Sequence, residues 1–309
     1  MSSLMMKNKR PVVGIALGSG ASRGWAHIGI INALEKMGIV PQVVTGTSIG
    51  SLVGAAYAAG NMGKLESWVC ALTKREISRF FEFGTSLSGF VHRERFNDFL
   101  NSNIATDAQL IEELPITYGS VATDLKSGRE EWLSSGSVLK SIWASAALPG
   151  LFPAVSHEDR WLVDGGLVNP VPVSLCRALG ADFVIAVNLN DGLVGKHFDK
   201  PKQASPEEVA GGNKFANFIR EYTGSLFNGE SDSKQPPNVF DAIAGTINIT
   251  QDRITRSRLA GDPPDLLLSP KLAHIDLLEF HRAGEAILEG ENCVKRLEEE
   301  IYYVLGNSF

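Results

Sequence analysis

Apolar residues occur along the chain in two kinds of run, which predict buried strands alternating with helices. Short runs of branched residues without polar alternation are typical of strands covered on both faces. These runs lie at residues 11–17, 43–45 and 182–188. Apolar positions at helical spacing lie at residues 25–37, 51–59, 137–147 and 173–179. The alternation predicts an α/β fold of three layers, α/β/α, around a mostly parallel central sheet.

The remaining apolar segments extend this pattern toward both ends of the sheet. A strand at residues 116–123 is predicted to turn at Asp124 into a second strand around residues 130–133. Asp124 stands where turns favour aspartate, so we interpret it as a turn-former. A last strand at residues 265–268 and helices at 275–289 and 291–305 are also expected.

A phenylalanine-rich stretch interrupts the helical pattern of residues 65–101. We expect core packing from these side chains, with an acyl-chain groove as the alternative, since such grooves are mostly apolar. They are Phe80, Phe81, Phe83, Phe90, Phe96 and Phe99.

Residues 191–238 are polar, contain a Gly-Gly and a Pro-Pro pair, and predict a mobile insertion. An apolar stripe inside it is expected to dock on the protein, with a lid or a lipid contact as alternatives. The stripe consists of Phe215, Phe218, Ile219, Tyr222 and Phe227. No repeat or clear linker is visible, so we expect one globular domain over 1–309, with residues 174–309 completing the sheet and adding helices.

Composition excludes several classes of protein. The 309 residues are 44% hydrophobic and 21% charged, and the net charge of −6 argues against nucleic-acid binding. The three cysteines, Cys70, Cys176 and Cys293, have no disulfide or metal-ligand spacing, so we expect a reducing, cytoplasmic setting and no metal or cofactor.

No segment predicts a signal peptide or a membrane span. Residues 11–17 form only a strand-length apolar run that opens into glycines. Residues 37–63 carry no charge, but Pro41 and six glycines interrupt them. Glycines at four-residue spacing suit a membrane helix pair, yet they suit a closely packed strand, turn and helix equally well.

The first candidate for chemistry is Gly46-Thr47-Ser48-Ile49-Gly50, between a strand and a helix. A serine at such a sharp turn is exposed in a strained conformation, and Gly46 and Gly50 leave room for the chain to double back. The free N–H groups of the following helix stabilise negative charge near the turn. Ser48 is therefore a candidate nucleophile, and a turn without chemistry is the alternative.

A second candidate is the glycine loop after the first strand, from Gly18 to Gly24. Arg23 stands where a dinucleotide-binding loop needs glycine, and the Gly-Lys-Ser/Thr of a P-loop is missing. Small residues also let backbone N–H groups converge on an oxyanion, which fits this loop better than a plain tight turn.

The third candidate is Asp164-Gly165-Gly166, which directly follows an apolar strand. Because two glycines follow Asp164, its carboxylate can face a cleft, although Asp-Gly-Gly turns also form for purely local reasons.

In this order the three motifs resemble the patatin-like phospholipase family, more closely its bacterial branch related to neuropathy target esterase. Gly24–Gly29 resembles the family's first helix, and Ala144–Pro153 resembles the segment before its catalytic aspartate. The resemblance covers a core of about residues 13–173 and is less specific beyond it.

The resemblance implies a Ser–Asp dyad, with Ser48 as nucleophile and Asp164 as base. It places Ser19, Gly20 and Ala21 at the oxyanion loop and Arg23 at the family's basic position. Many relatives, plants among them, have a run of glycines where this chain has Ser19 and Ala21. A small side chain preserves the N–H donor where φ is negative, so we expect a working oxyanion hole.

Two alternatives stay open at this point. An α/β-hydrolase triad in the order Ser, Asp, His would use His274 or His281. A regulatory binding protein would keep the fold without turnover. The resemblance implies a lipid or acyl-ester substrate and a cytoplasmic enzyme, with transient contact at the inner membrane as an alternative.

Overall fold

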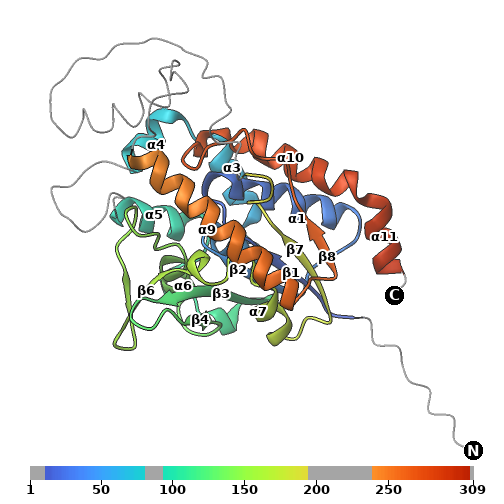
Figure 1. Cartoon of the computed structure of the whole chain (residues 1–309), viewed down its shortest axis with the longest axis horizontal. Helices are drawn as coiled ribbons and strands as arrows, with labels where there is room; N and C mark the ends of the chain where they lie inside the picture. The colour runs from blue at the N-terminus through green and yellow to red at the C-terminus, as the bar shows by residue number, and fades with distance from the viewer. Residues whose placement is uncertain (1–10, 81–92, 194–238, 307–309) are drawn as a thin grey trace, which may run out of the picture. The chain divides into compact units, whose positions relative to one another are not determined.

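The computed structural model describes residues 11–80, 93–193 and 239–306 (Figure 1). The chain divides into two compact units, residues 1–191 with 251–309 and residues 192–250. Within the second unit, the described residues from 239 onward form the first half of helix α9 (Val239–Gly261). The predicted insertion and its apolar stripe lie outside the described residues, and the single-domain expectation stays a prediction.

The first unit is built on one eight-stranded sheet. Its strands are β1 Val13–Leu17, β2 Val43–Thr47, β3 Thr117–Asp124, β4 Glu130–Leu133, β5 Val155–His157, β6 Arg160–Asp164, β7 Phe183–Val187 and β8 Leu266–Leu268. The order is β5-β6-β3-β2-β1-β7-β8, with β4 also paired to β3. The run from β3 to β8 is parallel, whereas β4 and β6 are antiparallel to β3. The mostly parallel sheet is confirmed.

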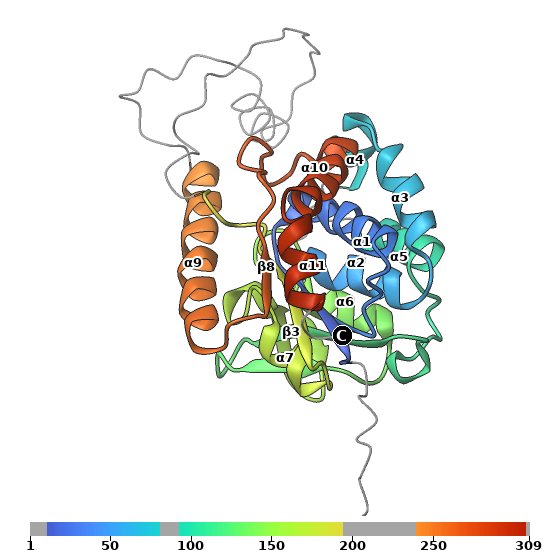
Figure 2. The same cartoon turned by 90° about the vertical axis from the view of Figure 1, so that its right-hand side faces the viewer.

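Helices cover both faces of this sheet. They are α1 Ala26–Lys36, α2 Ile49–Ala58, α3 Met62–Cys70, α4 Lys74–Phe80, α5 Arg93–Asn103, α6 Val138–Ser145, α7 Val173–Ala178, α10 Ala283–Arg296 and α11 Glu298–Gly306. Ile15 and Leu17 of β1 face a large core shared with α1, α2, α6 and α10, while Ala16 faces a smaller core shared with α7 and Leu259 of α9. Figure 2 shows β8 between residues 251–261 of α9 on one side and α10 on the other, and the three-layer architecture is confirmed.

The structure corrects the predicted helices near the C-terminus. Helix α9 was not predicted, and the expected helices 275–289 and 291–305 are instead α10 and α11. Hydrogen bonds from Asp276 N–H to Glu279 Oε2 (2.9 Å) and from Arg282 Nη1 to the His274 carbonyl (2.7 Å) hold the preceding residues in a loop. Ile275 is buried in that loop, so its apolar character does not require a helix.

Strand register brings the predicted motifs to one edge of the sheet. The loops after β1 and β2 emerge together because these strands are parallel neighbours. Thr47 pairs with Val121 of β3, and the next residue of β3, Ala122, pairs with Asp164 of β6. Ser48 and Asp164 therefore flank β3 at the same level although 116 residues separate them.

Two glycines allow a close crossing between α1 and α10. A Cβ at Gly29 would lie 1.9 Å from the Ile287 carbonyl oxygen, and one at Gly290 would lie 2.1 Å from that of Ala26. Both contacts involve backbone atoms, so a side chain at either position would force the two helices apart.

We expect Gly290→Ala to lower the free energy of unfolding by about 1–3 kcal/mol, the usual range for overpacking. Gly284→Ala is the matched control in the same helix, because a Cβ there would meet no described atom within 4 Å. The control should be neutral or raise stability by up to about 1 kcal/mol, reflecting helix propensity. Urea denaturation measures both, and equal effects would contradict the close crossing.

Candidate active site

Ser48 occupies a strained turn between β2 and α2. Its φ of 56° and ψ of −121° are unusual for a residue with a side chain. A Cβ at Gly46 would lie 2.3 Å from the carbonyl carbon of Gly50, and one at Gly50 would lie 2.1 Å from the Leu17 carbonyl oxygen. The Ser48 N–H donates to Ser145 Oγ of α6 at 2.9 Å, which holds the turn from the other side. The predicted need for both glycines is thus explained by backbone contact.

The hydroxyl of Ser48 donates to the carboxylate of Asp164, with 2.6 Å between Oγ and Oδ2. The other carboxylate oxygen, Oδ1, accepts from the Gly166 N–H at 2.7 Å. Thr123 Oγ1 donates to the Asp164 carbonyl at 2.8 Å, which ties the backbone to β3. Gly165 is needed here, since a Cβ would lie 2.1 Å from the Val121 carbonyl oxygen. The structure therefore brings the predicted nucleophile and the predicted base into direct contact.

Asp164 is only 1% exposed, while Ser48 is half-buried. Burial raises the pKa of Asp164 to about 6, against the opposing effect of the hydrogen bonds from Ser48 and Gly166. A carboxylate with this pKa is a stronger base than an ordinary aspartate and is still mostly ionised at neutral pH.

Two backbone N–H groups of the glycine loop have no hydrogen-bond partner within the part of the chain that the structure describes. The Ser19 N–H donates to the Pro170 carbonyl at 2.8 Å, and the Ser22 N–H donates to the Leu277 carbonyl at 3.2 Å. Between them, the N–H groups of Gly20 and Ala21 have no hydrogen-bond partner among the described residues. Of the predicted oxyanion donors, Gly20 and Ala21 are therefore available, whereas the Ser19 N–H is occupied.

The expected negative φ is wrong for Ala21, whose φ is +49°. The left-handed conformation costs an alanine about 1 kcal/mol more than a glycine, and it lets the loop turn sharply into the 3₁₀-helix η1 (Ala21–Trp25).

The other predicted residues of the loop support its shape. Arg23 is 2% exposed, and burial lowers the pKa of its guanidinium to about 10 against the opposing effect of Asp276. The backbone N–H of Arg23 donates to the Gly20 carbonyl at 3.2 Å. A Cβ at Gly18 would lie 2.5 Å from the Val187 carbonyl oxygen, and one at Gly24 would lie 2.2 Å from a side-chain carbon of Ile49. Both glycines therefore mark close contacts of the loop with its neighbours.

No described histidine bonds Ser48 or Asp164. His274 Nε2 lies 2.7 Å from Glu285 Oε1 in an exposed pair, and His281 lies in the 3₁₀-helix η5 (Phe280–Arg282). His27 is fully buried, and its Nε2–H donates to the Gly18 carbonyl at 2.8 Å. The histidines named for a triad are thus not brought to the predicted nucleophile.

Sequence reasoning missed three residues beside these loops. Ser145 lies within residues 144–153, which resemble the family, but the sequence indicates no role for it. Asn190 follows the buried strand β7, and a polar residue at that end of a parallel strand was an available signal. Gln251 of α9 carried no signal, because its place depends on how a distant helix packs.

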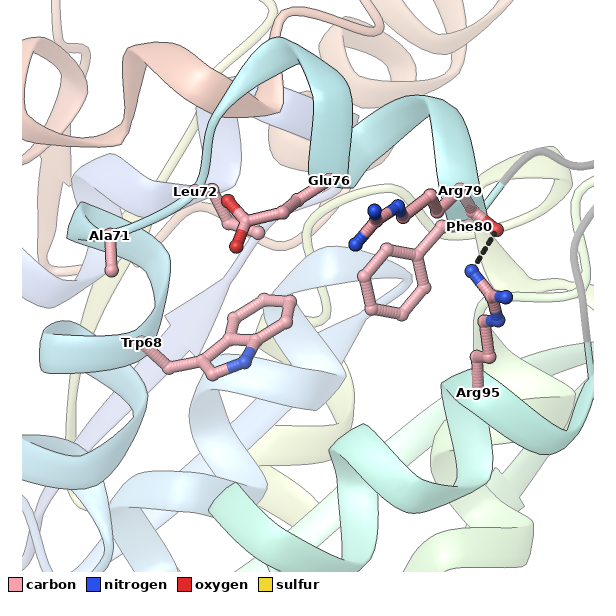
Figure 3. Close-up of a pocket in the computed structure, with 7 residues that line it drawn as sticks. All are labelled: Trp68, Ala71, Leu72, Glu76, Arg79, Phe80 and Arg95. Carbon is pink, nitrogen blue, oxygen red and sulfur yellow. Dashed lines mark hydrogen bonds between the residues drawn. The ribbon is translucent and has the colours of Figure 1, made fainter.

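An open cavity of about 280 Å³ lies among α3, α4 and α5 (Figure 3), and none of the residues that line it belongs to the three predicted motifs. Trp68 and Phe80 present their rings to it, while Glu76 and Arg79 lie above them. Arg95 donates to the Arg79 carbonyl at 3.2 Å.

The cavity borders a run of aromatic contacts that reaches α6. Ring centroids lie 4.1 Å apart for Trp68 and Phe99, 5.9 Å for Phe99 and Phe96, and 4.8 Å for Phe96 and Trp143. Phe99 is buried and Phe80 and Phe96 pack on the core, as predicted, while Phe81, Phe83 and Phe90 lie outside the described residues.

The described residues contain neither a membrane-spanning helix nor a cluster of metal ligands. No described helix combines the length and the hydropathy needed to cross a membrane. No group of three or more His, Cys, Asp or Glu side chains within those residues could hold a metal ion.

The chain is similar to a family model, to two named proteins and to one solved structure. Residues 15–177 match the family model described as patatin-like phospholipase. The chain is 32% identical to an NTE family protein of Mycobacterium tuberculosis, over 91% of this chain and 89% of that protein. It is 30% identical to lysophospholipase NTE1 of Pyricularia oryzae, over 90% of this chain but 18% of that longer protein. The solved structure of VipD from Legionella pneumophila aligns at 12% identity and a TM-score of 0.39, covering 97% of this chain and 78% of that one.

The raised pKa of Asp164 predicts a pH-dependent cost to stability. An unfolded aspartate titrates near 3.9, so the folded state holds the proton more tightly. The stabilising contribution is complete below about pH 4 and is lost as the pH rises through about 6. A shift of about two pKa units corresponds to roughly 3 kcal/mol.

Asp164→Asn cannot titrate, so its stability relative to the wild type should increase by up to roughly 3 kcal/mol between pH 4 and pH 7. Urea denaturation of both proteins across this range gives the difference, in which the shared titrating groups cancel. A difference that is flat or decreases with pH would contradict the raised pKa.

Proposed function

The chain belongs to the patatin-like phospholipase family, and from this premise we propose that it is a serine acyl hydrolase that cleaves carboxylic esters of lipids. The observation that carries the proposal is the 2.6 Å hydrogen bond from Ser48 Oγ to Asp164 Oδ2 at a strained turn. A nucleophile bonded to its base, with unused N–H donors in the adjacent loop, is the arrangement that acyl transfer requires.

In the first step, Ser48 Oγ attacks the ester carbonyl while its proton passes to Asp164 Oδ2. The carbonyl oxygen becomes an oxyanion, which the N–H groups of Gly20 and Ala21 stabilise. Collapse of the tetrahedral intermediate breaks the ester bond, and the protonated Asp164 gives its proton to the leaving alcohol. The acyl group remains on Ser48.

In the second step, Asp164 takes a proton from a water molecule that attacks the acyl-serine. The same two N–H groups stabilise the second oxyanion, and the proton returns to Ser48 as the fatty acid leaves. The Gly166 N–H bond to Asp164 Oδ1 keeps Oδ2 directed at the serine throughout. One carboxylate thus serves as base and acid in both halves of the reaction.

The proposed substrate is a lipid ester of the phospholipase A or lysophospholipase type. Two findings support this class: the family description and the lysophospholipase name of the fungal relative. We assign the acyl chain to the cavity beside Trp68 and Phe80, from which a run of ring contacts reaches Trp143 of α6. Access to such a substrate calls for transient contact with a lipid surface, and we place the enzyme in the cytoplasm.

Ser48→Ala and Asp164→Asn should each lower kcat for a short-chain nitrophenyl ester by at least about a thousandfold, because loss of a nucleophile or its base has effects of this size. Ser67→Ala, on the exposed face of α3, is the matched serine control and should retain activity. Fluorophosphonate labelling of Ser48 in the folded protein separates an enzyme from a binding protein that retains the fold. Retained turnover in either site variant would remove that residue from the mechanism.

The pH dependence of kcat/KM tests the role of Asp164 as base. Only the ionised carboxylate can accept the serine proton, so activity should rise with pH through a single limb near 6 and level off above it. Below the limb, kcat/KM should fall about tenfold per pH unit, as a single titration requires. Activity that is independent of pH between 4 and 8 would contradict this role.

A further inference from the structure

A buried cluster of polar side chains lies directly behind the glycine loop. Asn190 Nδ2 lies 3.2 Å from the Ser19 carbonyl oxygen and 3.0 Å from Gln251 Oε1. Ser19 Oγ donates to the same Gln251 oxygen at 3.0 Å. Exposure is 1% for Ser19 and Asn190 and 6% for Gln251. Asn190 and Gln251 lie beyond residues 15–177, which the family model matches.

The bond to Ser19 matters because of peptide geometry. The Ser19 carbonyl and the Gly20 N–H belong to the same planar trans peptide unit, so they point in opposite directions and turn together. A donor that fixes the carbonyl from one side also fixes the direction of the Gly20 N–H on the other side. Hydrogen bonding to the carbonyl further polarises the peptide and strengthens its N–H as a donor.

We infer that Asn190 and Gln251 are positioning residues for the oxyanion hole, acting through the Ser19–Gly20 peptide; this inference rests on the proposed hydrolase function. Asn190 holds the peptide directly. Gln251 acts one step further away, because its Oε1 accepts from both Asn190 and Ser19 and thereby orients the Asn190 amide.

Gln251 also lies against the loop that carries the base. A Cβ at Gly166 would lie 2.4 Å from Gln251 Nε2 and 2.9 Å from Asp164 Oδ1. The glycine therefore lets the amide approach the turn whose N–H binds Asp164. One side chain of α9 thus contacts the loops of both the oxyanion hole and the base.

The cluster is not arranged for maximum stability. Asn190 Oδ1 is buried and has no partner among the described residues. An unsatisfied buried acceptor costs about 1–3 kcal/mol, and such exceptions in a native structure are typical of functional sites. Gly20 permits the close fit, since a Cβ there would lie 2.7 Å from a side-chain carbon of Leu189, the residue before Asn190.

Asn190→Asp and Gln251→Met test this inference with little change in volume. The aspartate removes both N–H donors and, when ionised at pH 8, faces two acceptor oxygens. The methionine removes the acceptor that orients Asn190. Thr255→Val is the matched control on α9, because Thr255 is buried one turn further along and its Oγ1 has no partner among the described residues.

Steady-state kinetics are measured at pH 8 on a nitrophenyl ester and on the thionoester that has sulfur in place of the carbonyl oxygen. Sulfur is a weak hydrogen-bond acceptor, so the rate of thionoester hydrolysis depends less on the oxyanion hole than the rate of oxygen-ester hydrolysis does. For the oxygen ester we expect kcat to fall about 100-fold in Asn190→Asp and about 10-fold in Gln251→Met, with KM within about twofold, since loss of a donor or misplacement costs this much. In both variants the ratio of the oxygen-ester rate to the thionoester rate should fall together with kcat. In Thr255→Val both the kcat and this ratio should equal those of the wild type.

A purely structural role would lower both rates alike and leave their ratio unchanged, and that result would overturn the inference. So would wild-type kinetics in both variants. If Asn190→Asp does not fold, the ratio of oxygen-ester to thionoester rates in Gln251→Met tests the inference by itself. Wild-type turnover that Ser48→Ala abolishes keeps the proposed function intact whichever way the variants behave, whereas a wild type without turnover or fluorophosphonate labelling overturns both.

Discussion

The hydrogen bond between Ser48 and Asp164 requires a buried carboxylate beside a strained serine, and most of the surrounding structure serves those two conditions. Asp164 is enclosed by β3, β6 and the turn that follows it, and this enclosure gives the carboxylate its raised pKa. Ser48 stays at a positive φ because β2, α2 and α6 hold the turn from three sides. Neither residue would keep its geometry in an isolated peptide.

Close backbone approach is the second constraint that shapes the molecule. At Gly46, Gly50 and Gly165 a Cβ would collide with backbone atoms of a neighbouring segment. Gly29 and Gly290 allow the same close backbone contact between α1 and α10. Glycine is used here because the segments pack with their main chains nearly in contact, which brings three loops to one point at the edge of the sheet.

The carboxyl-terminal part of the chain contacts the glycine loop and also contributes strands to the sheet. Strand β7 lies beside β1 and leads into Asn190, while α9 contributes Gln251. These residues bring buried amides to the back of the glycine loop. The family model matches residues 15–177. Asn190 and Gln251 lie beyond this range and belong to no short motif, yet they contact the glycine loop inside it.

The sequence by itself determined the three motifs, the succession of the main strands and helices along the chain, and the α/β class, because these depend on local spacing and on the length of apolar runs. Ser48, Asp164 and the glycine loop could all be named before any distance was known. Strand register, the conformation of Ala21, the occupied Ser19 N–H and the contacts of Gln251 were decided only by the tertiary structure. Each of them depends on segments far apart in the chain, and a local pattern carries no information about which distant group will satisfy a buried donor or acceptor. The start of α10 differs from the prediction for the same reason, since packing against the core overrides local periodicity where an apolar residue such as Ile275 is buried in a loop.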